Sequence, residues 1–278
     1  MVDTPTVSVI IPTRNSSEFI ERCIQSILNQ TYPNIEIIVV DRYSDDNTVN
    51  LSQQFDSVKV IQAEAEPTSI DLGRPSGQMN IGIKNSIGKY VYRVDSDFIV
   101  EPDVISEAIF LCESKGHKGV LIHNTSDSSA GYWAKVRKLE RDCYVDDYNH
   151  VAVRFVLKEL LIKIKGFDSS SGFEDYDLHN RILNESSSIG RINSTEIHLG
   201  EPKSLKDVVV KHVYYGSIMS RYIDKHPEKW KVQINPIRLA YLRHWRDFLN
   251  DPIVTIGFPL YQFVRFSSAL FGYLSSKL

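Results

Sequence analysis

The stretch that decides the fold is Lys89-Tyr90-Val91-Tyr92-Arg93-Val94-Asp95-Ser96-Asp97, an alternating apolar run that stops on two carboxylates. Residues two apart in an extended chain point to the same side, so Asp95 and Asp97 face one spot if the strand persists to its end. Hard cations such as Mg²⁺ and Mn²⁺ prefer carboxylate oxygen and need only one or two protein carboxylates when substrate phosphates complete the shell. The stretch therefore predicts a strand that ends at a metal site, with a solvated turn as the alternative.

Apolar runs alternate with helical patterns on both sides of this stretch. Continuous apolar strands separated by helices are typical of a parallel sheet covered on both faces, a Rossmann-like α/β fold. Ligands bind outside the carboxyl ends of such strands, where Asp41 and Asp95 each follow a predicted strand. The patterns predict strands at 7–11, 35–40, 58–61, 89–94, 120–122 and 151–157, and helices at 16–30, 48–55, 76–87, 104–113, 131–143, 205–225 and 237–249.

Length and composition favour an ordinary globular protein. The chain has 278 residues, 42% hydrophobic and 24% charged. Its three cysteines form no metal knuckle or redox motif, and no basic segment precedes the first strand, so we expect a cytoplasmic protein without a secretory signal. We predict one α/β domain at 1–203, with a donor half at about 1–123 and an acceptor half at about 124–203, followed by a helical extension at 204–278.

Positive charge gathers near the end of the chain. Residues 203–278 hold 12 lysines and arginines against 5 acids, although the net charge of the whole chain is -3. The run 237–249 has a basic amphipathic pattern, and the apolar run 252–274 is interrupted by Pro259 and Arg265, which disfavours a membrane-spanning helix. We expect residues 229–278 to lie on an anionic membrane surface, and no nucleic-acid partner. The alternative is packing on the domain or across a homodimer.

Several motifs occur in the order seen in family 2 glycosyltransferases of the GT-A fold, which the chain resembles from about residue 7 to about residue 227. It departs from the family pattern at Arg42-Tyr43, where Asp-Gly is usual, and at Met79, where a basic residue often stands. The matching motifs are Val-Ser-Val-Ile-Ile-Pro-Thr-Arg-Asn at 7–15, Asp-x-x-Ser-x-Asp-x-Thr at 41–48, Asn80-x-Gly82, Asp-Ser-Asp at 95–97, Gly-Phe-Asp at 166–168 and Glu-Asp-x-Asp-Leu at 174–178.

The resemblance implies an inverting transfer from a nucleotide-sugar, UDP- or GDP-linked, with Mn²⁺ or Mg²⁺ held through the Asp-x-Asp motif. Asp97 would hold the metal, with His198 as a tentative further ligand or phosphate contact, and Asp175 beside Glu174 would be the general base. The alternatives are a backbone-satisfied histidine and acids that merely favour a helix N-terminus. The implied donor-binding residues are Pro12, Arg14, Asn15, Asp41, Asn80, Asp95 and Ser96.

The acceptor implied by the resemblance is a glycan or a lipid-linked molecule at the inner face of the cell membrane. A polyprenyl-phosphate glycosyl synthase remains an alternative, because a lipid phosphate is already anionic and needs no general base. A non-catalytic nucleotide-sugar-binding protein and a nucleotidyltransferase are alternatives of another class. A nucleotidyltransferase usually opens with a glycine-rich phosphate loop, whereas residues 12–17 contain no glycine.

Overall fold

The computed structural model describes residues 4–63, 75–171, 173–186 and 188–278. They fall into two compact units, each with its own apolar core. Unit 1 comprises the chain up to His123 together with Ala152–Ser170 and Glu174–Glu196, and unit 2 comprises Asn124–Val151, Ser171–Phe173 and Ile197–Leu278. The domain bounds predicted from the sequence stay a prediction.

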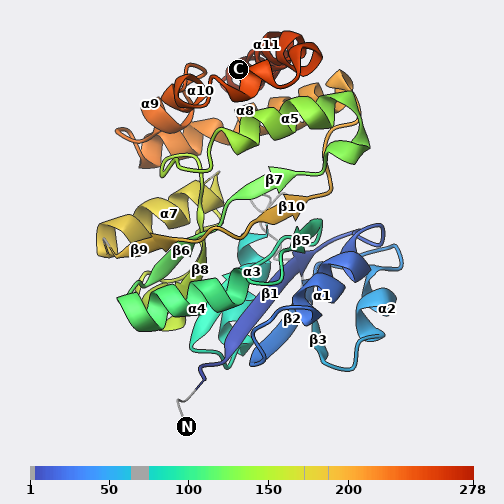
Figure 1. Ribbon diagram of the computed structural model, residues 1–278, viewed down its shortest axis with the longest axis vertical. Helices are drawn as coiled ribbons and strands as arrows, with labels where there is room; N and C mark the ends of the chain where they lie inside the picture. The colour runs from blue at the N-terminus through green and yellow to red at the C-terminus, as the bar shows by residue number, and fades with distance from the viewer. Residues whose placement is uncertain (1–3, 64–74, 172, 187) are drawn as a thin grey trace. The chain divides into compact units, whose positions relative to one another are not determined.

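Unit 1 is built on a seven-stranded sheet with the strand order β3-β2-β1-β4-β8-β6-β9 (Figure 1). The strands β3, β2, β1 and β4 run parallel, and β8 is antiparallel to both β4 and β6. The predicted mainly parallel α/β sheet is thus confirmed. The strands span Val7–Thr13 (β1), Ile35–Asp41 (β2), Val58–Gln62 (β3), Tyr90–Arg93 (β4), Gly119–Leu121 (β6), Val153–Leu157 (β8) and Ile189–Arg191 (β9).

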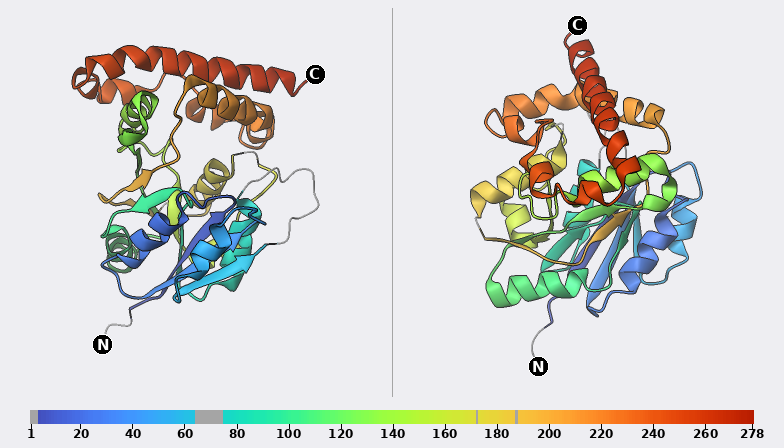
Figure 2. Two further views of the ribbon diagram at one scale, coloured as in Figure 1. Left: turned by 90° about the vertical axis from the view of Figure 1, so that its right-hand side faces the viewer. Right: turned by 45° about the horizontal axis from the view of Figure 1, so that its top comes forward.

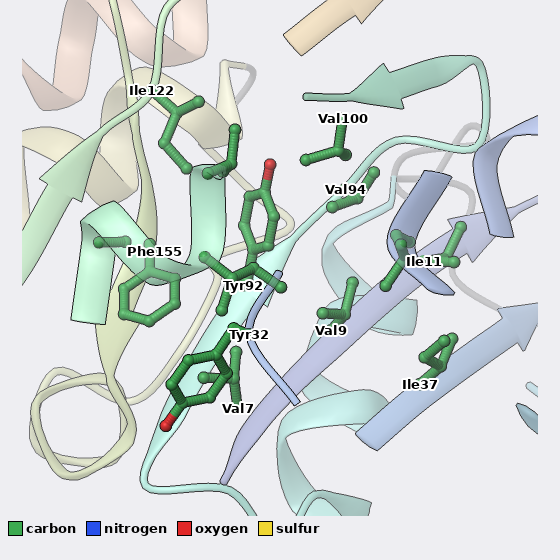
Figure 3. Packing of buried hydrophobic residues seen from close by; sticks show 14 of the residues in the cluster. Val7, Val9, Ile11, Tyr32, Ile37, Tyr92, Val94, Val100, Ile122 and Phe155 are labelled. Atoms are coloured by element: carbon green, nitrogen blue, oxygen red, sulfur yellow. The ribbon is translucent and has the colours of Figure 1, made fainter. Parts of the chain in front are cut away.

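Helices cover both faces of this sheet. The helices α1 (Ile20–Leu28) and α4 (Val104–Lys115) share one buried cluster with alternate residues of β1, including Val7, Val9 and Ile11. Figure 3 shows Val9 and Ile11 of this cluster together with Tyr92 of β4, the strand next to β1, and Phe155 of β8, the strand beyond it. The opposite face of β1 packs on α3, where a Cβ atom on Gly82 would meet Ile10. The remaining helices of unit 1 are α2 (Thr48–Gln53), α3 (Ser76–Asn85), α6 (Lys158–Lys163) and α7 (Glu174–Glu185).

The strand predicted at 89–94 ends one residue earlier in the structure, at Arg93. β4 stops at Arg93, and residues 95–97 form a turn in which the Phe98 amide donates to the Asp95 carbonyl at 3.0 Å before β5 (Phe98–Val100) begins. The pairing of β4 with β8 reaches only Tyr92, so this ladder does not keep the chain extended beyond Arg93. The expectation that strand alternation orients Asp95 and Asp97 is therefore wrong, because the turn orients them.

Unit 2 is mainly helical. Its longest elements, α8 and α11, lie side by side in Figure 2, and their backbones approach so closely that a Cβ atom on Gly272 would stand 2.0 Å from the Val213 carbonyl oxygen. The helix α8 begins with a capping box, in which Ser204 and Asp207 each bond the backbone of the other. The strand β10 (Glu196–His198) begins at the last residue of unit 1 and continues into unit 2. The elements that lie wholly in unit 2 are β7 (Asn124–Ser126), η1 (Ser128–Ala130), α5 (Tyr132–Asp142), α8 (Leu205–Lys225), α9 (Trp230–Gln233), α10 (Leu239–Arg243), η2 (Asp247–Leu249) and α11 (Pro252–Ser275).

The single helix predicted over 237–249 is wrong. The chain there forms the short helix α10 and the 3₁₀ turn η2, which are separated at His244. The imidazole of His244 lies 3.2 Å from carboxylate oxygens of both Asp146 and Asp247. An amphipathic pattern of 13 residues is too short to hold a helix by itself, so these polar contacts decide the local structure.

The helix α11 has two unlike faces. Its inner residues Val254, Phe258 and Tyr261 belong to the buried cluster of unit 2. On the opposite side large apolar residues are exposed, among them Ile256 at 78% and Phe263 at 72%. By length and composition alone, α11 could also cross a membrane, with 33% of its most apolar window buried.

Candidate active site

The carboxyl ends of β1 and β2 lie side by side, with Thr13 paired to Asp41. Asp41 is completely buried, and its carboxylate accepts hydrogen bonds from the Ser44 amide at 3.0 Å and the Ser44 hydroxyl at 2.5 Å. Tyr43, at the position where the family usually has glycine, adopts a left-handed φ of 47°. The turn after β2 therefore keeps its shape without the glycine, at the strain expected for a side chain there.

The loop after β1 is tied to this turn. The Asn15 side-chain oxygen accepts from the Asp45 amide at 3.0 Å, and the Asn15 amide donates to Ser44 Oγ at 2.8 Å. Asn15 has a φ of 51°, a conformation that asparagine tolerates better than most residues. Arg14 is exposed, whereas Pro12 is buried within β1. The structure thus brings Arg14, Asn15 and Asp41 to one edge of the sheet.

The helix α3 reaches the same strand ends through Gln78. Its side-chain amide donates to the carbonyl oxygens of Thr13 at 2.9 Å and Val40 at 2.7 Å, although the side chain is buried. Asn80 exchanges two hydrogen bonds with the backbone of Phe167, at 2.8 and 2.9 Å. Gly166 has a φ of 66°, and a Cβ atom there would lie 2.4 Å from the Asn80 oxygen. Asn80 therefore fixes the Gly166–Phe167 turn.

Asp95 is held by two arginines. Its Oδ1 lies 3.0 Å from Arg93 Nε and its Oδ2 lies 2.7 Å from Arg154 Nη2. Burial opposes ionisation of this carboxyl, but the two guanidinium charges outweigh it and hold the pKa of Asp95 well below its usual range. Both carboxylate oxygens are thus engaged within the protein.

The same arginines extend the network in both directions. Arg93 also forms an ion pair with Asp175, and Arg154 Nε lies 3.1 Å from an oxygen of Glu196. Glu196 is completely buried and accepts from the Tyr92 hydroxyl at 2.5 Å. Burial raises the pKa of Glu196 to about 7, although Arg154 acts in the opposite direction. A continuous series of ion pairs therefore connects Asp175 to the buried Glu196.

Asp97 is the third residue of the same turn and is partly exposed. The neighbouring Ser96 is buried, and its hydroxyl lies 2.8 Å from the hydroxyl of Ser16, which joins the turn to the loop after β1. Among the residues that the structure describes, no group of three or more His, Cys, Asp and Glu side chains could hold a metal ion. One exposed carboxylate fits a metal that takes its other ligands from water and substrate phosphates.

Asp175 and Glu174 open the helix α7. Both are partly buried, and the side chain of Asp175 is 40% exposed. Its partner Arg93 also lies 5.7 Å from the centre of the Phe167 ring, on the turn fixed by Asn80. The structure thus places Asp175, Arg93 and Asp95 in one connected group, while Glu174 has no partner in that group among the residues described above.

His198 belongs to unit 2. Its Nδ1 lies 2.7 Å from Glu201, which also accepts from the Ser126 hydroxyl at 2.5 Å. Burial opposes ionisation of Glu201, but its bond with His198 and the charge of Arg141 lower the pKa of Glu201 to about 2. The predicted contact of His198 with a metal or a donor phosphate stays a prediction.

Sequence reasoning missed three residues of this site, namely Gln78, Arg93 and Arg154. The two arginines were visible as charged residues inside otherwise apolar predicted strands, which is a signal that they have buried partners. Their common partner Asp95 depends on β4 and β8 being neighbours, and the sequence did not predict that order. Gln78 gave no comparable signal within its helical pattern.

The sequence matches the family model described as glycosyl transferase family 2 over residues 8–167. That stretch begins in β1 and ends at Phe167, so it includes Asp41, Asn80 and the turn with Asp95 and Asp97. More than half of the chain is matched.

Individual relatives agree with this match. The chain is 26% identical over 218 residues to glycosyltransferase GlyG of Streptococcus pneumoniae, covering 75% of this chain and 64% of that protein. The chain thus spans less than two-thirds of the length of this relative.

Solved structures show the same fold over nearly the whole chain. The mannosyltransferase PcManGT from Pyrobaculum calidifontis, in complex with GDP-Man and Mn²⁺, superposes with a TM-score of 0.68 at 15% identity, over 99% of this chain and 88% of that one. Residues 1–349 of TarS from S. aureus, in complex with UDP-GlcNAc, superpose with a TM-score of 0.57 at 17% identity, over 98% and 90% of the two chains. These likenesses establish the GT-A fold predicted from the sequence.

Proposed function

The chain belongs to glycosyl transferase family 2, and from that premise we propose that it transfers a sugar from a nucleotide-sugar to a glycan or lipid-linked acceptor, with a divalent metal and with inversion. The observation that carries the proposal is the shared edge of β1, β2 and β4, where Asp41, the Asp95–Asp97 turn and Asp175 all belong to unit 1. Ligands of open α/β sheets bind at this edge.

The donor would lie along the loop after β1. Arg14 and Asn15 are exposed there and give the loop a polar surface suited to a base and ribose, while the buried Asp41 supports it through its bonds with Ser44. PcManGT was solved with GDP-Man and TarS with UDP-GlcNAc, which supports a nucleotide-sugar donor without choosing its base. Pro12 and Ser96 are buried, so they would support the donor-binding loop from within the protein.

Asp97 would hold the metal, either Mn²⁺ or Mg²⁺. A bound cation stabilises the negative charge that develops on the leaving nucleoside diphosphate, a contribution commonly worth several kcal/mol. Asp95 would act differently from the role implied by the resemblance. Because Arg93 and Arg154 engage both of its oxygens, Asp95 would set the position of the turn, and the donor would contact the turn through Asp97.

Asp175 would be the general base that accepts the proton of an attacking hydroxyl, with Glu174 beside it. Its pairing with Arg93 fixes the carboxylate relative to the turn. Asn80 would contribute indirectly, by fixing the Gly166–Phe167 turn that Arg93 touches.

We further propose that the protein works at the cytoplasmic face of the cell membrane. The segment 229–278 combines a basic charge excess with the exposed apolar face of α11, a combination typical of helices that lie in an anionic bilayer surface. Arg265 on the inner side of α11 is paired with Glu140 of α5, which ties that side to the protein. A homodimer formed through the exposed face is the alternative.

Calorimetry tests the central proposal. We expect a UDP- or GDP-sugar to bind the full chain only in the presence of Mn²⁺, and Asp97→Asn to weaken that binding at least about tenfold, since a charge-assisted contact is lost. Asp45→Asn, an exposed acid on the neighbouring turn, is the control and should bind as the unchanged protein does. If neither donor class binds with or without metal, the proposed function is overturned.

A further inference from the structure

One group of side chains in unit 2 holds more arginines than carboxylates. Glu140 and Glu201 have side chains that are 0% and 1% exposed, and four arginines surround them. The arginines thus exceed the carboxylates by two charges within one group of side chains from α5, α11 and the segments before α8 and α10. The four arginines, here the arginine cluster, are Arg137, Arg141, Arg238 and Arg265.

The two glutamates are already fully engaged. Glu140 forms ion pairs with Arg137 and Arg265 and accepts from the Tyr144 hydroxyl at 2.8 Å. Glu201 accepts from Ser126 at 2.5 Å and contacts His198 at 2.7 Å. Arg141 and Arg238 lie farther from these carboxylates, at 3.4 Å from Glu201 and 3.9 Å from Glu140, so two negative charges serve four arginines.

Three arginines of the cluster keep unused donors. Within the described part of the chain, Arg137 and Arg265 each donate one side-chain hydrogen bond, to Glu140, although a guanidinium carries five N–H groups. Arg141 donates to the Asn124 side chain, while its buried Nε lies 3.4 Å from Glu201 without hydrogen-bond geometry. Arg238 differs, because Tyr144, Asn235 and Gln233 all accept from it.

Arg137 and Arg265 can be reached from solvent, whereas Nε of Arg141 is buried. The side chain of Arg137 is 22% exposed and that of Arg265 is 16% exposed. Burial and the nearby charge of Arg137 lower the pKa of Arg141 to about 10, whereas the charge of Glu140 outweighs burial and raises the pKa of both Arg137 and Arg265 above the usual range. Arginine presents paired donors that match phosphate oxygens, so a phosphate is the anion that this group suits best.

We propose that Arg137, Arg141 and Arg265 bind a phosphate or diphosphate group of the acceptor. The inference rests on the proposed function and gives its acceptor a chemical class. Arg265 lies on the side of α11 opposite to the exposed apolar residues Ile256 and Phe263, and Phe263 is only about 3 Å away from it along the helix axis. A phosphate in the arginine cluster and a hydrocarbon chain on the exposed face can therefore belong to one lipid-linked molecule.

Calorimetry with inorganic pyrophosphate tests the site in the full chain. The buffer contains EDTA, so that no metal draws pyrophosphate to the Asp97 turn. We expect Arg137→Gln and Arg265→Gln each to weaken binding at least about tenfold, because each removes charge-assisted hydrogen bonds. Lys138→Gln is the matched control, since Lys138 lies beside Arg137 on α5 but pairs with Asp142, and it should bind as the unchanged protein does.

Removing a negative charge from the group, instead of a positive one, tests whether the arginines bind an anion or only stabilise the structure. Glu140→Gln removes one counter-charge and should tighten pyrophosphate binding, whereas a loss of structure would weaken it. If Arg265→Gln does not fold, Arg137→Gln decides, because Arg137 is the more exposed of the two. Absence of pyrophosphate binding, or equal weakening by Lys138→Gln, overturns the inference.

A second ligand separates the two sources of phosphate. Geranyl diphosphate should bind at least about tenfold more tightly than pyrophosphate if the acceptor is a lipid, since burying its chain adds apolar contact. Equal affinities would assign the site to a soluble phosphorylated glycan. Nucleotide-sugar binding with Mn²⁺, measured on the same Arg137→Gln protein, keeps the failure of this inference distinct from failure of the proposed function.

Discussion

A single guanidinium connects the two halves of the proposed chemistry. Arg93 bonds Asp95 on the metal turn and pairs with Asp175 at the start of α7. A carboxylate held in this way cannot rotate freely, so the proposed base keeps a fixed position relative to the turn that carries Asp95 and Asp97. This pairing makes Asp175 the residue whose replacement is most informative.

We expect Asp175→Asn to lower transfer to a hydroxyl acceptor by about 10²–10⁴-fold, the usual contribution of a general base. Donor binding with Mn²⁺ should stay unchanged, and single-turnover assays with radiolabelled donor measure both quantities. Full transfer by the variant would remove the base role and favour the phosphate acceptor of a polyprenyl-phosphate glycosyl synthase. The control is Glu185→Gln at the far end of α7, because Glu185 and its partner Lys163 are exposed, whereas the other acid of the motif, Asp177, is buried against Arg181.

A titration in unit 2 gives a prediction for stability. Burial opposes ionisation of Asp147, but bonds from His150 and the Asn149 amide lower the pKa of Asp147 from 3.8 to about 2. The unfolded chain therefore takes up this proton first, so the stabilisation is present above about pH 3.8 and is lost as the pH falls toward 2. It amounts to about 2 kcal/mol for a shift of this size.

Asp147→Asn should accordingly flatten the fall in unfolding free energy across that pH window. Urea unfolding followed by circular dichroism at several pH values provides the measurement. The exposed Asp45→Asn is the control for a general charge effect. A variant that loses stability with acid as steeply as the unchanged protein does would contradict the assignment.

Elements with strong local patterns were predicted well from the sequence. The β-branched runs gave β1, β2 and β3, and the pattern over 205–225 gave α8 with its bounds unchanged. Three-residue strands such as β5, β7 and β10 were missed, because so short a run has no readable period.

Long-range pairing explains the rest of what the sequence did not reveal. Tyr92 pairs with Phe155 across β4 and β8, and this register brings Arg93 and Arg154 to the two sides of Asp95. The sequence predicted Asp41, Asp95 and Asp97 at one edge because strand ends can be read locally. It did not predict their arginine partners, which lie 61 residues apart and meet only in the finished sheet.

The contact between α8 and α11 gives a prediction for one element. A Cβ atom on Gly272 would lie 2.0 Å from a carbonyl oxygen of α8, and one on Gly216 would lie 1.9 Å from a carbonyl oxygen of α11. Gly272→Ala gains about 1 kcal/mol of helix propensity but overpacks backbone against backbone at about 3 kcal/mol. We expect a net loss of about 2 kcal/mol in unfolding free energy.

Thermal and urea unfolding measure this loss. Ser267→Ala on the exposed side of the same helix is the control and should change stability little. If Gly272→Ala leaves the melting temperature unchanged, the two helices move apart to accommodate the methyl group without loss of stability, which contradicts the prediction.

The two units have different surfaces, which matters for where the whole molecule works. Large exposed apolar residues are frequent from residue 237 onward, and Ile256, Leu260 and Phe263 form a continuous line on α11. Burying one such side chain contributes about 1.5–3 kcal/mol, so a few of them hold a protein on a bilayer. This surface belongs to unit 2, whereas the metal turn belongs to unit 1.

We expect the protein to co-sediment with vesicles containing anionic lipid, and more weakly with neutral vesicles or at high salt. Ile256→Ser with Phe263→Ser should lower the vesicle partition coefficient at least about tenfold. The control is Ile87→Ser, because Ile87 in unit 1 is 77% exposed, close to the 78% of Ile256. A stable homodimer by light scattering that binds no vesicles would assign the face to a second copy instead.

The antiparallel strand β8 carries a consequence for how the chain reaches this fold. It lies between β4 and β6, yet the chain runs through Asn124–Val151 of unit 2 before β8 is made. During synthesis β4 therefore keeps an unpaired edge, with Tyr92 and Arg93 uncovered, until residue 157 has left the ribosome. The nascent protein is thus most exposed to aggregation and to chaperones over this interval, and a truncated chain that stops before Leu157 keeps the open edge permanently.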